Sequence, residues 1–371
     1  MSPPSARYAP APACSPSAGS STKRILVVDD SALMRKVLRD LFAERGRYEV
    51  QTARNGADAL VQIERFNPDV VTLDVNMPEM DGLTCLSHIM TRCPRPVVMV
   101  SSITQRGAQA TLEALALGAV DFVEKPGGTV SLEIDVISGE ILAKVAAATR
   151  ARPRMAKAIA SAARSKIESA SRPKPATTSQ AIAGLVLIGV STGGPRTLED
   201  ILPTLSESFP WPIVVAQHMP AAFTGSFAAR LNKLCALEVR EASAPTPLAR
   251  GHIYIARGSA DVVIERMLGR VIVKSAPEDP QMRWHPSVDR LVASAMKVMD
   301  PRTLVGVVLT GMGDDGAHAM ADLLKSGGRT IAEDSSTAVV FGMPNELIRL
   351  GGASKVLPCD RIAEQLSQWI M

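Results

Sequence analysis

The chain has 371 residues, of which 46% are hydrophobic and 21% are charged, and its formal net charge is +4. This length is sufficient for two domains with sizeable cores, and the apolar fraction excludes a wholly disordered or fibrous chain. No apolar run approaches the roughly 18–20 residues that a membrane-spanning helix needs, so the sequence also excludes an integral membrane protein.

Residues 1–22 are predicted to form a disordered leader. They are rich in proline, alanine and serine and lack the apolar core of a signal peptide. The five cysteines include no C-x-x-C pair, and this pattern favours free thiols over a disulfide framework or a zinc site. Together these features predict a cytoplasmic protein.

Residues 23–145 are predicted to form a first α/β domain. Short β-branched runs alternate with amphipathic segments there, which is typical of an open parallel sheet with helices on both faces. The expected strands are 25–28, 48–52, 70–73, 97–100 and 120–123, and the expected helices lie near 32–44, 56–66, 82–91, 107–117 and 132–148.

Residues 146–181 are predicted to form a basic linker. Between positions 144 and 175, nine basic residues and one acid give a charge of +8, so the rest of the chain carries −4. The positive balance therefore describes a tether and does not indicate nucleic-acid binding. A solvated linker is the simplest interpretation, and contact with anionic lipid or an acidic receptor tail is the alternative.

Residues 182–371 are predicted to form a second α/β domain, doubly wound and mainly parallel. Buried strands are expected at 185–190, 213–217 and 304–310, each followed by a loop rich in glycine or polar residues. Shorter strands at 253–256, 262–265 and 271–273 are expected to form a β-rich edge.

Acidic residues end two strands of the first domain. Asp29 and Asp30 follow the first strand and Asp74 ends the third, while Ser101 and Lys125 follow the fourth and fifth. The carboxyl ends of parallel strands share one edge of a sheet, where α/β folds place their sites. Three carboxylates there favour a hard divalent cation such as Mg²⁺, although simple helix capping is an alternative.

The segments VVDDS, LDVNMPEMDG, MVSS and DFVEKP resemble, in this order and spacing, the receiver domain of two-component response regulators. The resemblance implies a flavodoxin-like (βα)5 fold and a phosphorylation switch. Phe122 occupies the usual aromatic switch position but lacks the hydroxyl of a tyrosine. The implied roles are phosphoacceptor for Asp74, phosphate-pairing cation for Lys125, switch residue for Ser101, and Mg²⁺ ligation by Asp29, Asp30, Asp74 and the backbone carbonyl of Asn76.

A glycine-rich turn at 189–194, GVSTGG, follows the first strand of the second domain. The glycines let the backbone turn sharply and expose the hydroxyl of Ser191, and the following helix offers N–H donors for an oxyanion. A phosphate-binding turn or a helix cap would produce the same pattern, so the turn alone does not define a nucleophile.

A base and an acid accompany this serine. His218 directly follows a buried strand and is expected at the same sheet edge, with His285 as the competing base. Asp314 and Asp315 follow a third strand, where a carboxylate could orient the imidazole. Helix capping or a metal-binding loop is the alternative for these two acids.

The segments GVSTGGP, QHMP and LTGMGDDG together resemble the catalytic domain of the chemotaxis response-regulator methylesterases, a family with a receiver in front of that domain. The resemblance implies that Ser191 is the nucleophile, His218 the general base and Asp315 the acid that orients it. It also places Thr192 and Met312 beside the oxyanion. The chain order Ser…His…Asp differs from that of α/β-hydrolases, so a lipase-like fold is not implied.

The implied activity is phosphorylation-activated demethylation of glutamate γ-methyl esters and deamidation of specific glutamines, with no cofactor for the esterase reaction. The implied partners are methyl-accepting chemotaxis receptors as substrate and the chemotaxis histidine kinase as phosphodonor. A monomer with no nucleic acid and no membrane insertion is expected. The unphosphorylated receiver is expected to pack across the Ser191 cleft.

Three alternatives are weighed against this hypothesis. A DNA-binding response regulator would need a helix-turn-helix module, which the second domain does not resemble. A receiver-controlled binding module with an inactive esterase site is disfavoured because all three triad positions carry competent side chains. An esterase of the same fold in a sensory pathway other than chemotaxis is not distinguished by the sequence.

Overall fold

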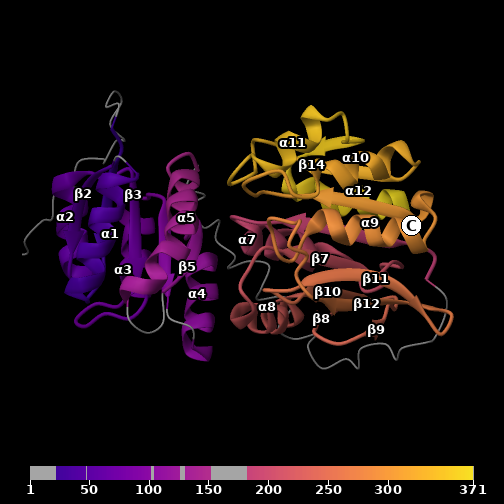
Figure 1. Ribbon diagram of the computed structural model, residues 1–371, viewed down its shortest axis with the longest axis horizontal. Helices are drawn as coiled ribbons and strands as arrows, with labels where there is room; N and C mark the ends of the chain where they lie inside the picture. Colours follow the sequence, from indigo (N-terminus) through magenta and orange to yellow (C-terminus); the bar gives the residue numbers. More distant parts are fainter. Residues whose placement is uncertain (1–21, 47, 102–103, 126–129, 152–181, 371) are drawn as a thin grey trace, which may run out of the picture.

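The computed structural model describes residues 22–46, 48–101, 104–125, 130–151 and 182–370, which form two α/β domains side by side (Figure 1). Residues 1–21 of the predicted leader and residues 152–181 of the predicted linker lie outside the described residues. Among the described residues, no helix is both long and apolar enough to cross a membrane.

The first domain is built on a five-stranded sheet in which all neighbouring strands are parallel. Its order is β2-β1-β3-β4-β5, so the direction of winding changes between β1 and β3 and opens a crevice at their carboxyl ends. The strands are β1 (Arg24–Val28), β2 (Glu49–Ala53), β3 (Val70–Asp74), β4 (Val97–Ser101) and β5 (Asp121–Glu124).

Helices cover both faces of this sheet, which explains why β3 and β4 are buried along their whole length. Four of the helices begin at a residue whose side chain accepts an N–H of the first turn, namely Ser31, Asn55, Asp81 and Thr104. The helices are α1 (Ala32–Glu44), α2 (Gly56–Phe66), α3 (Gly82–Arg92), α4 (Gln105–Leu117) and α5 (Val130–Ala148).

The second domain is built on a seven-stranded parallel sheet with β6 near its centre. Its order is β15-β14-β13-β6-β7-β10-β8. The strands are β6 (Leu185–Val190), β7 (Ile213–Gln217), β8 (Glu238–Ala242), β10 (His252–Ala256), β13 (Leu304–Val308), β14 (Arg329–Glu333) and β15 (Lys355–Leu357). The helices are α7 (Gly194–Ile201), α8 (Ala221–Leu234), α9 (Val288–Val298), α10 (Ala317–Lys325), α11 (Met343–Arg349) and α12 (Cys359–Ile370), with short 3₁₀ turns at Leu202–Thr204 and Pro301–Thr303.

The three short strands expected at the edge divide between two sheets. The strand predicted at 253–256 belongs to the main parallel sheet as β10, whereas β11 (Asp261–Met267) and β12 (Arg270–Ala276) form an antiparallel hairpin that β9 (Thr246–Pro247) extends. The structure thus confirms the predicted fold class and corrects this detail.

The cysteines follow the expectation only in part. Cys85, Cys235 and Cys359 are buried and form no disulfide, and burial raises the pKa of the Cys85 thiol to about 12. Cys93 departs from the expectation because it is disulfide-bonded.

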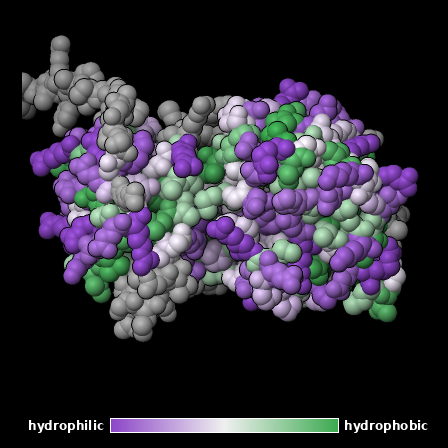
Figure 2. Space-filling model, turned by 45° about the horizontal axis from the view of Figure 1, so that its top comes forward, coloured by the Kyte–Doolittle hydropathy of each residue, from purple (hydrophilic) through white to green (hydrophobic). Residues whose placement is uncertain are grey.

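The two domains meet across an apolar interface. Helix α4 packs on α7 and α8, and the ring of Phe122 in β5 lies 4.4 Å from that of Phe223 in α8, measured between centroids. One buried apolar cluster continues from Leu112 of α4 to Leu198 of α7. On the face seen in Figure 2, apolar and weakly polar residues run along this junction, whereas the surface on either side is mostly hydrophilic.

Candidate functional site

Three carboxylates of the first domain converge in the crevice between β1 and β3. One oxygen from each of Asp29, Asp30 and Asp74 lies within 4.8 Å of the other two. Asp29 and Asp74 are buried and Asp30 is exposed, so the cluster opens to solvent on one side. Hard oxygen ligands with room for water are the donor set that Mg²⁺ prefers, and these residues fit that ion.

Lys125 neutralises part of this charge. Its Nζ lies 2.9 Å from Asp29 Oδ2 and 2.8 Å from Asp74 Oδ2. Burial raises the pKa of Asp74, although Lys125 opposes that shift. Burial lowers the pKa of Lys125, but its hydrogen bonds and attraction to Asp74 and Asp29 outweigh burial, so the net shift is upward. Lys125 is therefore protonated at neutral pH and places a cation beside Asp74.

The other predicted receiver residues lie around this cluster. The backbone N–H of Asn76 donates to Asp74 Oδ1 at 3.3 Å. Ser101 ends β4 and is fully buried, with its hydroxyl 3.5 Å from the carbonyl oxygen of Gly107. Phe122 follows one residue after the start of β5, and its ring contacts the second domain. The predicted switch residue is thus part of the interface between domains.

Ser191 lies directly after β6, held by backbone hydrogen bonds on both sides. Its N–H donates to the carbonyl of Thr310 at 3.0 Å, and its carbonyl accepts from the N–H of Gly194 at 2.8 Å. A Cβ on Gly311 would come within 2.8 Å of the Ser191 Cβ, so only glycine fits there. The Cβ that carries the Ser191 hydroxyl is therefore fixed between the β6–α7 turn and the loop after β13.

His218 lies directly after β7, the strand next to β6. Its backbone N–H donates to the carbonyl of Val190, and its Nε2 lies 2.8 Å from Asp315 Oδ2. Its Nδ1 is buried without a hydrogen-bond partner among the described residues. Because Nε2–H donates to the carboxylate, Nδ1 is the ring nitrogen left to accept a proton.

Asp315 is bound by the N-terminus of α9. Its carboxylate accepts the backbone N–H groups of Val288 at 2.7 Å and Asp289 at 3.0 Å, and the hydroxyl of Ser287 at 3.2 Å. These donors at the start of α9 hold the carboxylate in a fixed position. Helix capping of α10 is wrong for Asp315, because Gly316 occupies that position, and the neighbouring Asp314 is exposed.

His285, the competing base, is engaged elsewhere. Its Nδ1 lies 2.9 Å from Asp261 Oδ1, and Arg290 contacts the other oxygen of that carboxylate. The structure therefore pairs Asp315 with His218, as the hypothesis requires.

The two predicted oxyanion neighbours occupy different positions. Met312 follows Gly311 in the loop that contacts Ser191. Thr192 is buried, and its hydroxyl donates to Asp121 Oδ2 of the first domain at 2.6 Å. The first domain thus reaches the residue next to the candidate nucleophile.

Three contributors to this site were not predicted from the sequence: Asp121, Trp284 and Ser287. The ring of Trp284 stacks on that of His218, with centroids 5.4 Å apart and planes 10° apart. Ser287 was the one with a detectable signal, because a serine before an apolar helical pattern is a typical N-cap. Its capping bond to Arg290 confirms that signal.

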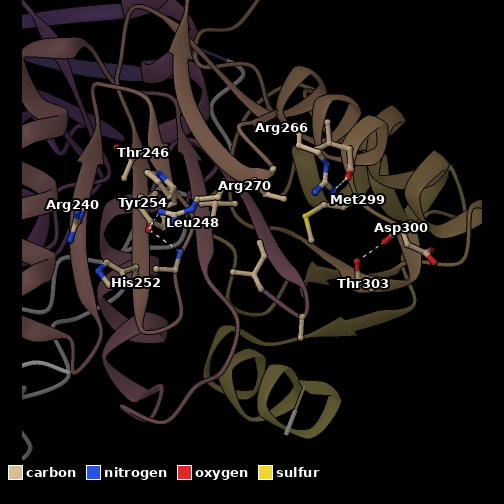
Figure 3. A pocket seen from close by; sticks show the side chains of 17 residues that line it. Arg240, Thr246, Leu248, His252, Tyr254, Arg266, Arg270, Met299, Asp300 and Thr303 are labelled. Atoms are coloured by element: carbon tan, nitrogen blue, oxygen red, sulfur yellow. Dashed lines mark hydrogen bonds between the residues drawn. The ribbon is translucent and has the colours of Figure 1, made fainter. Parts of the chain in front are cut away.

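A cavity of about 650 Å³ lies at the opposite edge of the second sheet (Figure 3). It is lined by Ile182 before β6, His252 at the start of β10 and Thr303 before β13, all at amino ends of strands. Ser191, His218 and Asp315 all follow carboxyl ends. The cavity is therefore separate from the candidate active site. Its walls include Arg240, Arg266 and Arg270.

Both domains match known protein families. Residues 25–136 match the response regulator receiver domain, and residues 186–366 match the CheB methylesterase domain. A protein-glutamate methylesterase/protein-glutamine glutaminase 3 of Rhodospirillum rubrum is 57% identical, covering 94% of this chain and 96% of the relative. A protein-glutamate methylesterase/protein-glutamine glutaminase 2 of Rhodopseudomonas palustris (strain BisB18) is 50% identical, covering 93% and 98%.

Among solved structures, the catalytic domain of Thermotoga maritima CheB methylesterase is 40% identical, covers 50% of this chain and 98% of that chain, and has a TM-score of 0.49. The matched domains define a response regulator whose output domain is a methylesterase domain. The chain belongs to the protein-glutamate methylesterase/protein-glutamine glutaminase family. The resemblance found in the sequence is thereby confirmed.

Proposed function

We propose that this protein is a phosphorylation-activated esterase that demethylates glutamate γ-methyl esters of methyl-accepting chemotaxis receptors. The supporting observation is the arrangement after three adjacent strands: Ser191 after β6, His218 after β7, and Asp315 in the loop after β13, with Nδ1 of the histidine free. A nucleophile, a base and an orienting carboxylate are the parts that acyl transfer requires.

In the proposed reaction, Ser191 Oγ attacks the ester carbonyl and His218 Nδ1 takes its proton. Asp315 stabilises the resulting imidazolium, and backbone donors near Met312 face the oxyanion. The C–O bond of the tetrahedral intermediate then breaks, and the methoxide leaves as methanol with the proton from His218. Water, deprotonated by His218, attacks the acyl-enzyme. The bond between the acyl carbon and Ser191 Oγ then breaks, Oγ takes the proton from His218, and glutamate is released.

The same residues also serve deamidation of a receptor glutamine. Attack on the side-chain amide gives an equivalent tetrahedral oxyanion, and the proton on His218 moves to the leaving nitrogen, which departs as ammonia. Both branches converge on one acyl-enzyme and one product, a glutamate side chain. A single site therefore accounts for both activities in the names of the relatives.

Asp74 is the proposed phosphoacceptor, with the chemotaxis histidine kinase as donor. A bound Mg²⁺, held by Asp29, Asp30, Asp74 and the Asn76 carbonyl, would offset charge on the incoming phosphoryl group. Lys125 supplies a second cation, and Ser101 supplies a hydroxyl. A receiver domain implies Mg²⁺-dependent phosphorylation in general, and the residue assignment here is our proposal.

Methanol release from isotopically methyl-labelled receptor membranes tests the function directly. The full-length protein with Mg²⁺ and acetyl phosphate should release labelled methanol faster than the protein without phosphodonor. A complete lack of methanol release under both conditions would contradict the proposal. Receptors from sensory pathways other than chemotaxis are assayed in parallel. If only these receptors are demethylated, the protein is an esterase of the same fold that acts outside chemotaxis.

Chelation of Mg²⁺ by EDTA should remove the stimulation by acetyl phosphate and leave the basal rate unchanged. The reason is that the acidic cluster lies in the first domain, whereas the esterase residues require no metal in the proposed reaction. Methanol release with and without EDTA measures this, and excess Mg²⁺ should restore stimulation. A fall of the basal rate with EDTA would indicate a metal in the esterase reaction itself.

Inhibition of the unphosphorylated form is proposed to act through the domain interface. Asp121 holds the hydroxyl of Thr192, and Phe122 packs on Phe223. Phosphorylation, by drawing Phe122 inward toward Ser101, would weaken this interface. Such a switch works through the free-energy difference between two states, and typical couplings are about 1–3 kcal/mol.

Replacing Asp121 by alanine should raise the basal rate of methanol release about tenfold, since hydrogen bonds to charged groups contribute about 1.5–3 kcal/mol. Lys144 keeps a partner in this variant because its Nζ also lies 2.9 Å from Glu140. Asp40→Ala is the matched control, since Asp40 pairs with Arg39 on α1, away from the interface. An unchanged basal rate in Asp121→Ala would refute an inhibitory role for this contact.

A further inference from the structure

Trp284 lies face to face with the candidate base. The offset stack on His218 has a 5.4 Å centroid distance and an angle of 10° between planes. A Cβ at Gly313 would lie 3.1 Å from Cζ2 of the indole, so the ring also contacts the loop between Gly311 and Asp315. The indole is therefore placed between the base and the loop that carries the acid.

One buried carboxylate fixes the segment that carries this tryptophan. Asp261, at the start of β11, accepts the backbone N–H of Asp279 before Trp284 and that of Ser287 after it, at 3.0 and 2.9 Å. It also binds His285 Nδ1 at 2.9 Å and Arg290 at 2.6 Å. Its side chain is fully buried. These four contacts hold the loop at both ends, so Trp284 presents a rigid surface.

The stack supplies a restraint that Asp315 does not. A hydrogen bond at Nε2 anchors one edge of the imidazole but leaves the ring free to tilt about that contact, which would displace Nδ1. A flat aromatic face against the ring restricts the tilt.

We propose that Trp284 is a positioning residue for His218, which holds the imidazole plane so that Nδ1 addresses Ser191. The inference rests on the proposed function, because it assigns His218 as the base. An aromatic ring is what the role requires, since the restraint is made by the ring face and not by the indole N–H.

The test compares Trp284→Leu with Trp284→Phe in the full-length protein, activated with Mg²⁺ and acetyl phosphate. Trp284→Leu should lower kcat for methanol release by up to about tenfold with KM nearly unchanged, because leucine removes the aromatic face that restrains the imidazole. Trp284→Phe should stay within about twofold of the parent. Trp369→Leu is the control, because Trp369 lies on α12 and stacks with Arg329 of β14.

A second readout separates this inference from the proposed function. The rate at which diisopropyl fluorophosphate phosphorylates Ser191, with loss of fluoride, depends on the base but not on a receptor substrate. If the parent releases no methanol but reacts with this reagent, and Trp284→Leu slows that reaction, the positioning role stands while the proposed substrate fails. Three results would each overturn the positioning role of Trp284. They are an equal loss of kcat in the leucine and phenylalanine variants, a change in KM alone, and an unchanged kcat in a Trp284→Leu variant that keeps the parental Tm.

Discussion

Replacing Ser191 by alanine is expected to lower methanol release by about 10⁴-fold or more. In the proposed reaction the oxygen of this hydroxyl forms the acyl-enzyme, and neither His218 nor Asp315 can substitute for it. Alanine retains the Cβ that packs against Gly311. The fold of the turn should therefore survive, and the loss should appear in kcat.

Two controls make this result specific. Ser206→Ala removes an exposed hydroxyl that bonds Ser208, and it should release methanol at the parental rate. Phosphorylation of the Ser191→Ala variant by acetyl phosphate should also be unchanged, because Asp74 lies in the other domain. Retention of esterase activity in Ser191→Ala would disprove the assignment of the nucleophile.

Replacing Asp315 by asparagine is expected to lower kcat by about 10⁴-fold, as removal of the orienting charge does in serine hydrolases of comparable design. The amide carries no charge to stabilise the imidazolium. Both oxygens of Asp315 also accept backbone N–H groups, from Val288 and Asp289. In the asparagine variant the side-chain NH2 group replaces one of these oxygens, so it must point at an N–H group that it cannot accept. An unsatisfied buried donor costs about 1–3 kcal/mol, so a lower Tm is expected as well.

The adjacent residue provides a matched control. Asp314→Asn makes the same chemical change one position earlier, where the side chain is exposed, and it should leave both kcat and Tm close to parental values. Steady-state kinetics on purified, folded variants measure the contrast. Similar kinetics for the two variants would show that Asp315 does not orient the base.

The sequence was sufficient to locate the candidate functional residues that follow strands. Asp74, Ser191 and His218 each come directly after a β-branched run, and parallel strands bring their carboxyl ends to one edge. The boundaries of β6 and β7 agree with the predicted ones. Strand β8 was missed because its EVREA sequence is half polar, as expected of the edge strand that it forms.

Contacts between loops could not be predicted in this way. The donors to Asp315 come from the start of α9, and the partner of Thr192 comes from β5, 71 residues earlier. No periodicity encodes such distances, because they depend on how the hairpin of β11 and β12 and the whole first domain dock. Trp284 is of the same kind, since its position follows from the loop fixed by Asp261.

The contact between Phe122 and Phe223 has a consequence for the order of events on the receptor. If phosphorylation favours separation of the domains, thermodynamic reciprocity requires that separation favours phosphorylation by the same factor. If a receptor segment at the Ser191 site competes with the first domain, as the proposed inhibition implies, its binding shifts the free receiver toward its phosphorylated conformation. Substrate would then act as an effector of its own demethylation, with activation concentrated where methylated receptors are abundant.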